Sequence, residues 1–92
     1  MATKTWTGDG VGNLASTDAN WSGATAPAVG DDVVFDGVFL VTGNNACTWD
    51  IATNLNSVDV QSGYTGQITL TATMNVTNAG TKALKLNGLV DA

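Results

Sequence analysis

The 92-residue chain contains no histidine, no arginine and no glutamate, and it has a single cysteine and a single proline. Without histidine, the serines, the threonines and the cysteine lack the usual base that activates a nucleophile. Zinc and other transition metals are excluded as well, because their sites are built from histidines and several cysteines. One cysteine also excludes a disulfide within the chain. These absences predict a protein that is not an enzyme and that holds no metal and no cofactor.

Charge is scarce too, at 12% of the residues, and eight aspartates against three lysines give a formal net charge of −5. Phosphate backbones and anionic membrane surfaces attract basic proteins, so neither nucleic acid nor a membrane is an expected partner. The sequence has no apolar leader and no apolar run long enough for a membrane span. We therefore expect no signal peptide, and a soluble chain made in the cytoplasm.

Short runs in which apolar and polar residues alternate are what the sequence does contain, and they predict β-strands. Glycine, asparagine and serine separate the runs, and helical periodicity is nearly absent. The predicted strands with this alternation are residues 58–61, 68–71, 74–77 and 84–87. Residues 33–35 and 38–41 are denser apolar runs, which predict strands covered on both faces. Their regular spacing is typical of a parallel β-helix, a small barrel or a β-sandwich.

The expected fold class is all-β, with a short β-helix or β-solenoid-like body and an N-terminal Trp-rich cap segment. Two features favour the β-helix. The strands follow one another without two-residue hairpin turns, and an amino acid that tolerates left-handed corners recurs between them. These corner residues are Asn54, Asn56, Asn75, Asn78 and Asn87. A small antiparallel β-sandwich is the alternative. We predict one domain over residues 1–92, with the cap at 1–32 and the strand body at 33–92.

Three aspartates, Asp31, Asp32 and Asp36, form the only carboxylate cluster. Glycosidase chemistry needs two carboxylates facing each other across a cleft, whereas neighbours on a strand point to opposite faces. We expect solvated turn carboxylates here, with a cation site as the alternative. The acidic, glycine-rich residues 8–13 lack the glutamate and the ligand spacing of a calcium loop, and they are predicted to form a flexible turn.

Aromatic side chains are the remaining candidates for function. Large aromatics in a small chain most often form its core, and we expect Trp6 and Trp21 to pack onto the β-body. Contact with a partner is one alternative. Solvent-exposed stacking of Trp21, Trp49 and Tyr64 on a sugar is another. Cys47, which has apolar neighbours, is predicted to be a small buried hydrophobe. The candidates for the cap or for partner contact are Trp6, Trp21, Phe35, Trp49 and Tyr64.

One pattern extends through much of the chain. Thr5-Trp6-Thr7-Gly8 is followed by Asn20-Trp21-Ser22, by Pro27 and by Gly30-Asp31-Asp32-Val33-Val34-Phe35, and Tyr64-Thr65-Gly66 later leads into an apolar strand. This pattern resembles the start of β-helical segments in autotransporter-like surface proteins. It also resembles small bacteriophage virion proteins of the head-decoration or cement kind. The resemblance covers roughly residues 5–70.

The short chain and the missing leader favour the virion version. The resemblance then implies a structural protein of a virion, made in the host cytoplasm, that decorates or cements the shell by binding repeated sites on the major capsid protein. It further implies a symmetric homo-oligomer, with a trimer favoured, whose interfaces would stabilise a small core. Two alternatives stay open: a carbohydrate-binding or adhesin module with exposed aromatics, and a piece of a longer β-solenoid surface protein.

Overall fold

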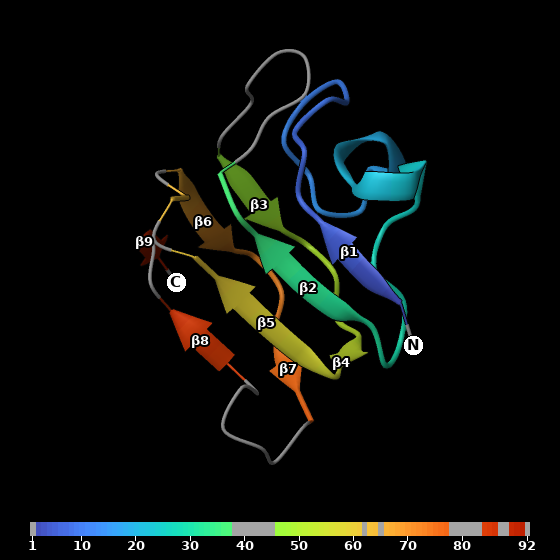
Figure 1. The fold of residues 1–92 in the computed structure, drawn as a ribbon, viewed down its shortest axis with the longest axis vertical. Helices are drawn as coiled ribbons and strands as arrows, with labels where there is room; N and C mark the ends of the chain where they lie inside the picture. Colours follow the sequence, from blue (N-terminus) through green and yellow to red (C-terminus); the bar gives the residue numbers. More distant parts are fainter. Residues whose placement is uncertain are drawn as a thin grey trace.

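Parallel β-strands dominate the protein (Figure 1), which we describe from a computed structural model. The structure describes residues 2–37, 46–61, 63–64, 66–77, 84–86 and 89–91, the last two ranges for the backbone alone. Within these ranges the helical elements are two single 3-10 turns, η1 (Asp18–Asn20) and η2 (Ser22–Ala24). The chain is therefore strand-rich and all-β, as the alternation of its apolar residues predicts.

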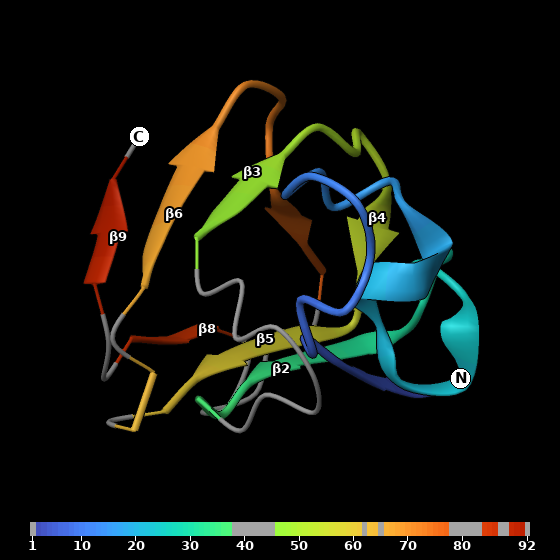
Figure 2. The ribbon, with the colours of Figure 1, turned by 90° about the horizontal axis from the view of Figure 1, so that it is seen from above.

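Three small sheets surround the core (Figure 2). The first sheet has the strand order β1 (Thr3–Thr5), β2 (Asp32–Phe35), β5 (Ser57–Val60), β8 (Leu84–Leu86). The second sheet has the order β3 (Cys47–Trp49), β6 (Gln67–Leu70), β9 (Leu89–Asp91). The third sheet consists of β4 (Asn54–Leu55) and β7 (Asn75–Val76). All pairs of these strands are parallel. The antiparallel pairing that a sandwich requires is therefore not found between the strands described.

The chain visits the sheets in a repeating order. β2, β3 and β4 are followed by β5, β6 and β7, and then by β8 and β9. We call one passage of the chain through the sheets a circuit. Each circuit lies beside the previous one, but the number of residues between neighbouring positions of successive circuits differs from sheet to sheet. Ser57 contacts Asp32, 25 residues earlier, whereas Thr71 contacts Trp49, 22 residues earlier. This irregular spacing explains why the sequence shows no exact repeat.

Side chains of the central strands alternate between the core and the outside, with every second residue of β2 and of β5 buried. Five predicted strands correspond to β2, β5, β6, β7 and β8, with ends shifted by at most one residue. The strand predicted at residues 38–41 lies outside the described residues. Four short strands, β1, β3, β4 and β9, were not predicted. Of these, β1 lies within the predicted cap, yet it pairs with β2 as part of the first sheet.

The predicted left-handed asparagine corners are wrong for the described residues. Asn54 and Asn75 lie inside β4 and β7 and face each other in register. Positive φ angles occur there at glycines and, among other residues, only at Ala24. Gly37, with φ +82°, also lies so close to the next circuit that an added Cβ would stand 2.1 Å from the Gly63 carbonyl oxygen. Asn78 and Asn87 lie outside the described residues.

Candidate functional site

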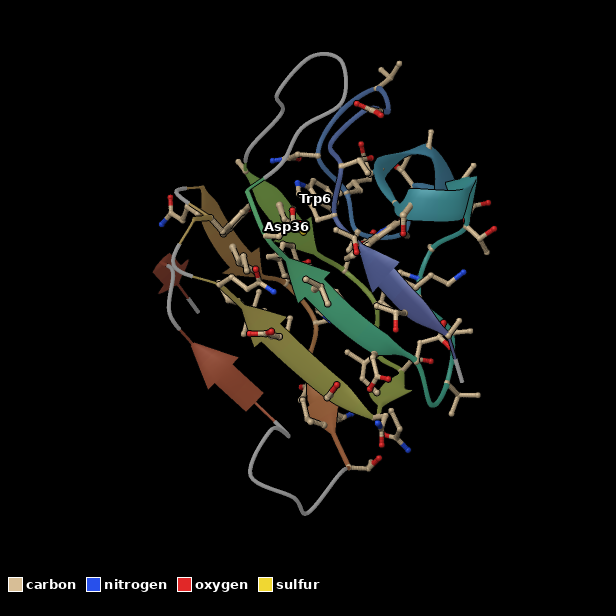
Figure 3. The ribbon with its side chains drawn as sticks, viewed as in Figure 1. Trp6 and Asp36 are labelled. Carbon is tan, nitrogen blue, oxygen red and sulfur yellow. The ribbon has the colours of Figure 1, made fainter. Side chains whose placement is uncertain are left out.

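The five aromatic candidates meet in one buried cluster, although they come from distant parts of the chain. Trp6 directly follows β1 (Figure 3), and Trp21 separates η1 from η2. Phe35 ends β2, Trp49 ends β3, and Tyr64 lies between β5 and β6. None of the five is more than 2% exposed. The N-terminal segment therefore packs its two tryptophans onto aromatic residues of the strand body.

Trp21 is the centre of this cluster. Its ring centroid lies 5.2 Å from that of Trp6, 5.7 Å from Phe35 and 6.2 Å from Trp49, and all three contacts are edge-on. Aromatic pairs in this geometry contribute about 0.5–1.5 kcal/mol each beyond the burial of their area. The Trp21 Nε1–H also donates to the Ala15 carbonyl at 2.7 Å. The ring is thus fixed by packing and by a hydrogen bond together.

Sugar stacking would require accessible faces on Trp21, Trp49 and Tyr64. Their exposed fractions are 2%, 0% and 1%. The indole N–H of Trp49 is also occupied, since it donates to the Ile51 carbonyl at 2.7 Å. The aromatics therefore form a core and not a binding platform in this structure.

Asn20 is the residue that sequence reasoning missed. Its side chain is fully buried. Its Oδ1 accepts a hydrogen bond of 2.7 Å from the Gly10 amide, and its Nδ2 donates to the Leu14 carbonyl at 3.1 Å. Its backbone carbonyl accepts the amides of Thr7 and Gly8. Residues 8–13, predicted to be a flexible turn, are therefore tied to a buried amide. The only signal was the position of Asn20 immediately before a core tryptophan.

The N-terminal segment also reaches all three sheets. β1 extends the first sheet, and Leu14 forms a parallel bridge to Thr48 of β3. The Gly30 amide donates to the Asn54 carbonyl of β4 at 2.8 Å. Outside these backbone contacts, Ser16 donates its amide and hydroxyl to the two carboxylate oxygens of Asp50, at 2.8 and 2.6 Å. The segment therefore covers one end of the strand body and contacts each of its sheets.

Asp31 fastens the N-terminal segment, whereas Asp32 connects β2 to residues at the start of β5. Asp31 is 6% exposed, and its carboxylate accepts the amides of Ala2 at 3.0 Å and Ala28 at 2.9 Å. The prediction of a solvated turn carboxylate is therefore wrong for Asp31, because its backbone partners replace water. Asp32 is partly exposed, and its carboxylate accepts hydrogen bonds from the side-chain amide of Asn56 and the hydroxyl of Ser57, both in the next circuit. The third aspartate, Asp36, follows β2 and is partly exposed (Figure 3).

These contacts set the charge states of the two carboxyls. Burial raises the pKa of Asp31, but the amides of Ala28 and Ala2 and the charge of Lys4 outweigh burial and leave the pKa below its ordinary value. The pKa of Asp32 is also lowered, chiefly by the hydrogen bonds from Ser57 and Asn56. Both carboxylates are thus stabilised as hydrogen-bond acceptors in the folded chain.

Cys47 is 1% exposed, which confirms its prediction as a buried hydrophobe. Burial raises the pKa of its thiol far above the ordinary value, so the reactive thiolate is disfavoured. Burial likewise raises the pKa of Tyr64. In the described part of the chain, no three His, Cys, Asp or Glu side chains are grouped as a metal site would require. None of the helices found there has the length and apolarity to span a membrane.

Comparison with known proteins adds no relative: no family model, no curated protein and no solved structure gives a significant match to this chain.

Proposed function

We propose that the chain is a short parallel β-helix that serves as a structural protein of a bacteriophage virion. In this proposal it decorates or cements the shell by binding repeated sites on the major capsid protein, as a symmetric homo-oligomer with a trimer favoured. The proposed role is non-enzymatic: the protein contributes contact surface, and its cysteine thiol is buried in the core. The β-helix part is supported by the parallel strands and by the order in which the chain visits the three sheets.

One observation carries the proposal. The N-terminal part of the pattern through which the sequence resembles virion and autotransporter-like proteins, from Trp6 to Asp31, builds a single layer at one end of the strands. Trp6 and Trp21 supply its aromatic packing, Asn20 ties its loop, and Asp31 fastens the chain start. This part of the pattern thus forms one structural element, which covers the end of the parallel strands. This correspondence supports a common architecture with the proteins of the resemblance.

The surface of one circuit supports a role in protein contact. From Gln67 to Thr77 every second residue is exposed, and all six are uncharged: Gln67, Thr69, Thr71, Thr73, Asn75 and Thr77. Two of these threonines also fasten the circuit to the one before it, since Thr71 and Thr77 donate their hydroxyls to the Trp49 and Leu55 carbonyls at 3.0 Å. A rigid, neutral, hydroxyl-rich surface is suited to hydrogen bonding with a protein shell whose sites repeat.

Sedimentation with shells tests the proposal. The chain is mixed with purified shells assembled from the major capsid protein encoded beside its gene, and the shells are pelleted. We expect saturable binding at a fixed ratio to capsid subunits, and no binding to shells of an unrelated phage. Chain that stays in the supernatant at all shell concentrations would refute the proposal. A gene with no capsid gene nearby would instead favour a piece of a longer β-solenoid surface protein.

A further inference from the structure

Ala2, the residue immediately before β1, is exposed, yet both of its backbone polar groups are bound. Its amide donates to the Oδ1 of Asp31 at 3.0 Å, and its carbonyl accepts the amide of Asp32 at 2.8 Å. The second contact continues the pairing of β1 with β2. The main-chain nitrogen of Ala2 is therefore fixed beside a carboxylate oxygen.

The Asp31 carboxylate is almost fully buried, but its hydrogen-bond donors in the described chain carry no charge. They are the amides of Ala2 and Ala28. Lys4 acts on this carboxylate through its charge and not through a hydrogen bond. Buried carboxylates usually have a cationic partner, because a charge removed from water costs free energy unless it is paired. Asp31 thus has the position of one half of an ion pair, and its donors are neutral.

A cation can be produced at the nitrogen of Ala2 itself. Hydrolysis of the Met1–Ala2 peptide bond adds water and breaks the C–N bond, so methionine leaves with a new carboxylate and Ala2 gains an α-amino group. That group is mostly protonated at pH 7. The small side chain of Ala2 is what aminopeptidases that remove methionine require in the next residue. The new ammonium would replace the amide that donates to Asp31.

We propose that Met1 is removed from the mature protein and that Asp31 binds the α-ammonium group of Ala2. The contact at Ala2 carries this inference, which holds for any cleavage that leaves Ala2 first and does not depend on what the protein binds. The amide of Asp32 keeps Ala2 in place, and the ion pair fastens the N-terminal segment to the start of β2. Acetylation of Ala2 or an added N-terminal tag would remove the charge from this nitrogen.

Intact-mass spectrometry and N-terminal sequencing test the cleavage. The untagged chain is expressed in bacteria and purified. We expect a mass lower than that of the full sequence by one methionine residue, with alanine as the first residue and its amine free. Retention of Met1, or an acetylated Ala2, would overturn the proposal.

Two chains released from cleavable fusion proteins test the ion pair. One begins at Ala2 and the other keeps Met1, so both have a free amine but only the first has it beside Asp31. Urea unfolding at pH 7 compares them. We expect the unfolding equilibrium constant of the Ala2 chain to be about three- to fivefold smaller, which is within the range that a partly exposed ion pair contributes.

Asp31→Asn in both chains is the matched control, because the difference between the two starts should disappear without the carboxylate. A difference that persists in Asp31→Asn would overturn the ion pair, since it would come from the methionine side chain and not from the charge. Equal stability of the two wild-type chains would overturn it as well, and this comparison stands even if Asp31→Asn does not fold.

Discussion

Asn20 contributes more to the stability of the fold than its sequence neighbours indicate. It lies in a stretch rich in glycine, serine and threonine. Such residues in sequence are typical of exposed turns, and asparagine is usually exposed. Here the side chain is fully buried and hydrogen-bonded, and its partners are backbone groups six to ten residues earlier. A buried amide with several backbone partners contributes most through what would remain unpaired without it.

We expect Asn20→Ala to lower the free energy of unfolding by about 1–3 kcal/mol, because the Gly10 amide loses its side-chain partner and the Leu14 carbonyl keeps only the Thr17 amide. Urea unfolding followed by tryptophan fluorescence measures the change. Asn75→Ala is the control, since Asn75 is exposed and the change there should stay within about 0.5 kcal/mol. Equal stability of wild type and Asn20→Ala would contradict this role.

The ionisation of Asp31 makes the stability of the fold depend on pH. Its carboxylate accepts two amides and has a lowered pKa in the folded chain. A group of this kind stabilises the fold fully above its unfolded pKa, and the stabilisation is lost as pH falls through the lower folded value. We therefore expect a loss of stability that begins near the ordinary aspartate pKa of 3.8 and continues below it.

Asp31→Asn tests this expectation. The amide cannot accept both backbone N–H groups with its nitrogen side, so the variant should be less stable than wild type at pH 7 by about 1–3 kcal/mol. Its stability should also fall less steeply than that of wild type below pH 5, because the titrating group is gone. Urea unfolding at a series of pH values gives both results. An unchanged acid slope would show that other carboxyls dominate.

Among elements, the strands that the sequence predicts show either apolar and polar residues in alternation, as β5 does, or a dense apolar run, as β2 does at residues 33–35. β3 also alternates, with Cys47 and Trp49 buried, but it is only three residues long and was not predicted. β1 is Thr-Lys-Thr and β4 is a pair of residues, so neither has an apolar period to detect. Strand partners could not be predicted either, because paired residues lie 21 to 29 positions apart, at spacings that differ from pair to pair.

The aromatic cluster was predictable in kind but not in geometry. Three tryptophans in a small chain point to a core, and Trp6 and Trp21 do pack on the body. The anchoring groups were harder to identify. Asp31 and Asn20 are residue types that sequence associates with solvent, and only the positions of their backbone partners show that they are buried. Local composition carries no information on contacts of that range.

At the scale of the whole molecule, the first 31 residues cover one end of the stack. They extend the first sheet, bridge to the second, contact the third and bury two tryptophans. Removing them would leave the edge of β2 unpaired and the faces of Phe35 and Trp49 uncovered. Open strand edges beside apolar surface are prone to aggregation.

We therefore expect a variant lacking residues 1–31 to aggregate or unfold under conditions in which the full chain is soluble. Light scattering after size-exclusion chromatography and circular dichroism check this. Deleting residues 75–77, which include β7, measures how well the fold tolerates any deletion. The full chain carrying Trp6→Ala and Trp21→Ala together tests the aromatic contacts of the N-terminal segment. A stable monomer without residues 1–31 would contradict the covering role.

The close approach of Gly37 to the Gly63 carbonyl limits how this architecture can vary. At that corner two successive circuits touch backbone to backbone, which leaves no room for any side chain, while the connections that follow differ in length between circuits. Substitution is thus constrained at this glycine contact, whereas the connections between strands can change in length. A lineage of such proteins would diverge by lengthening its loops while its stacked glycines stay fixed, and that pairing of small residues would outlast recognisable similarity elsewhere.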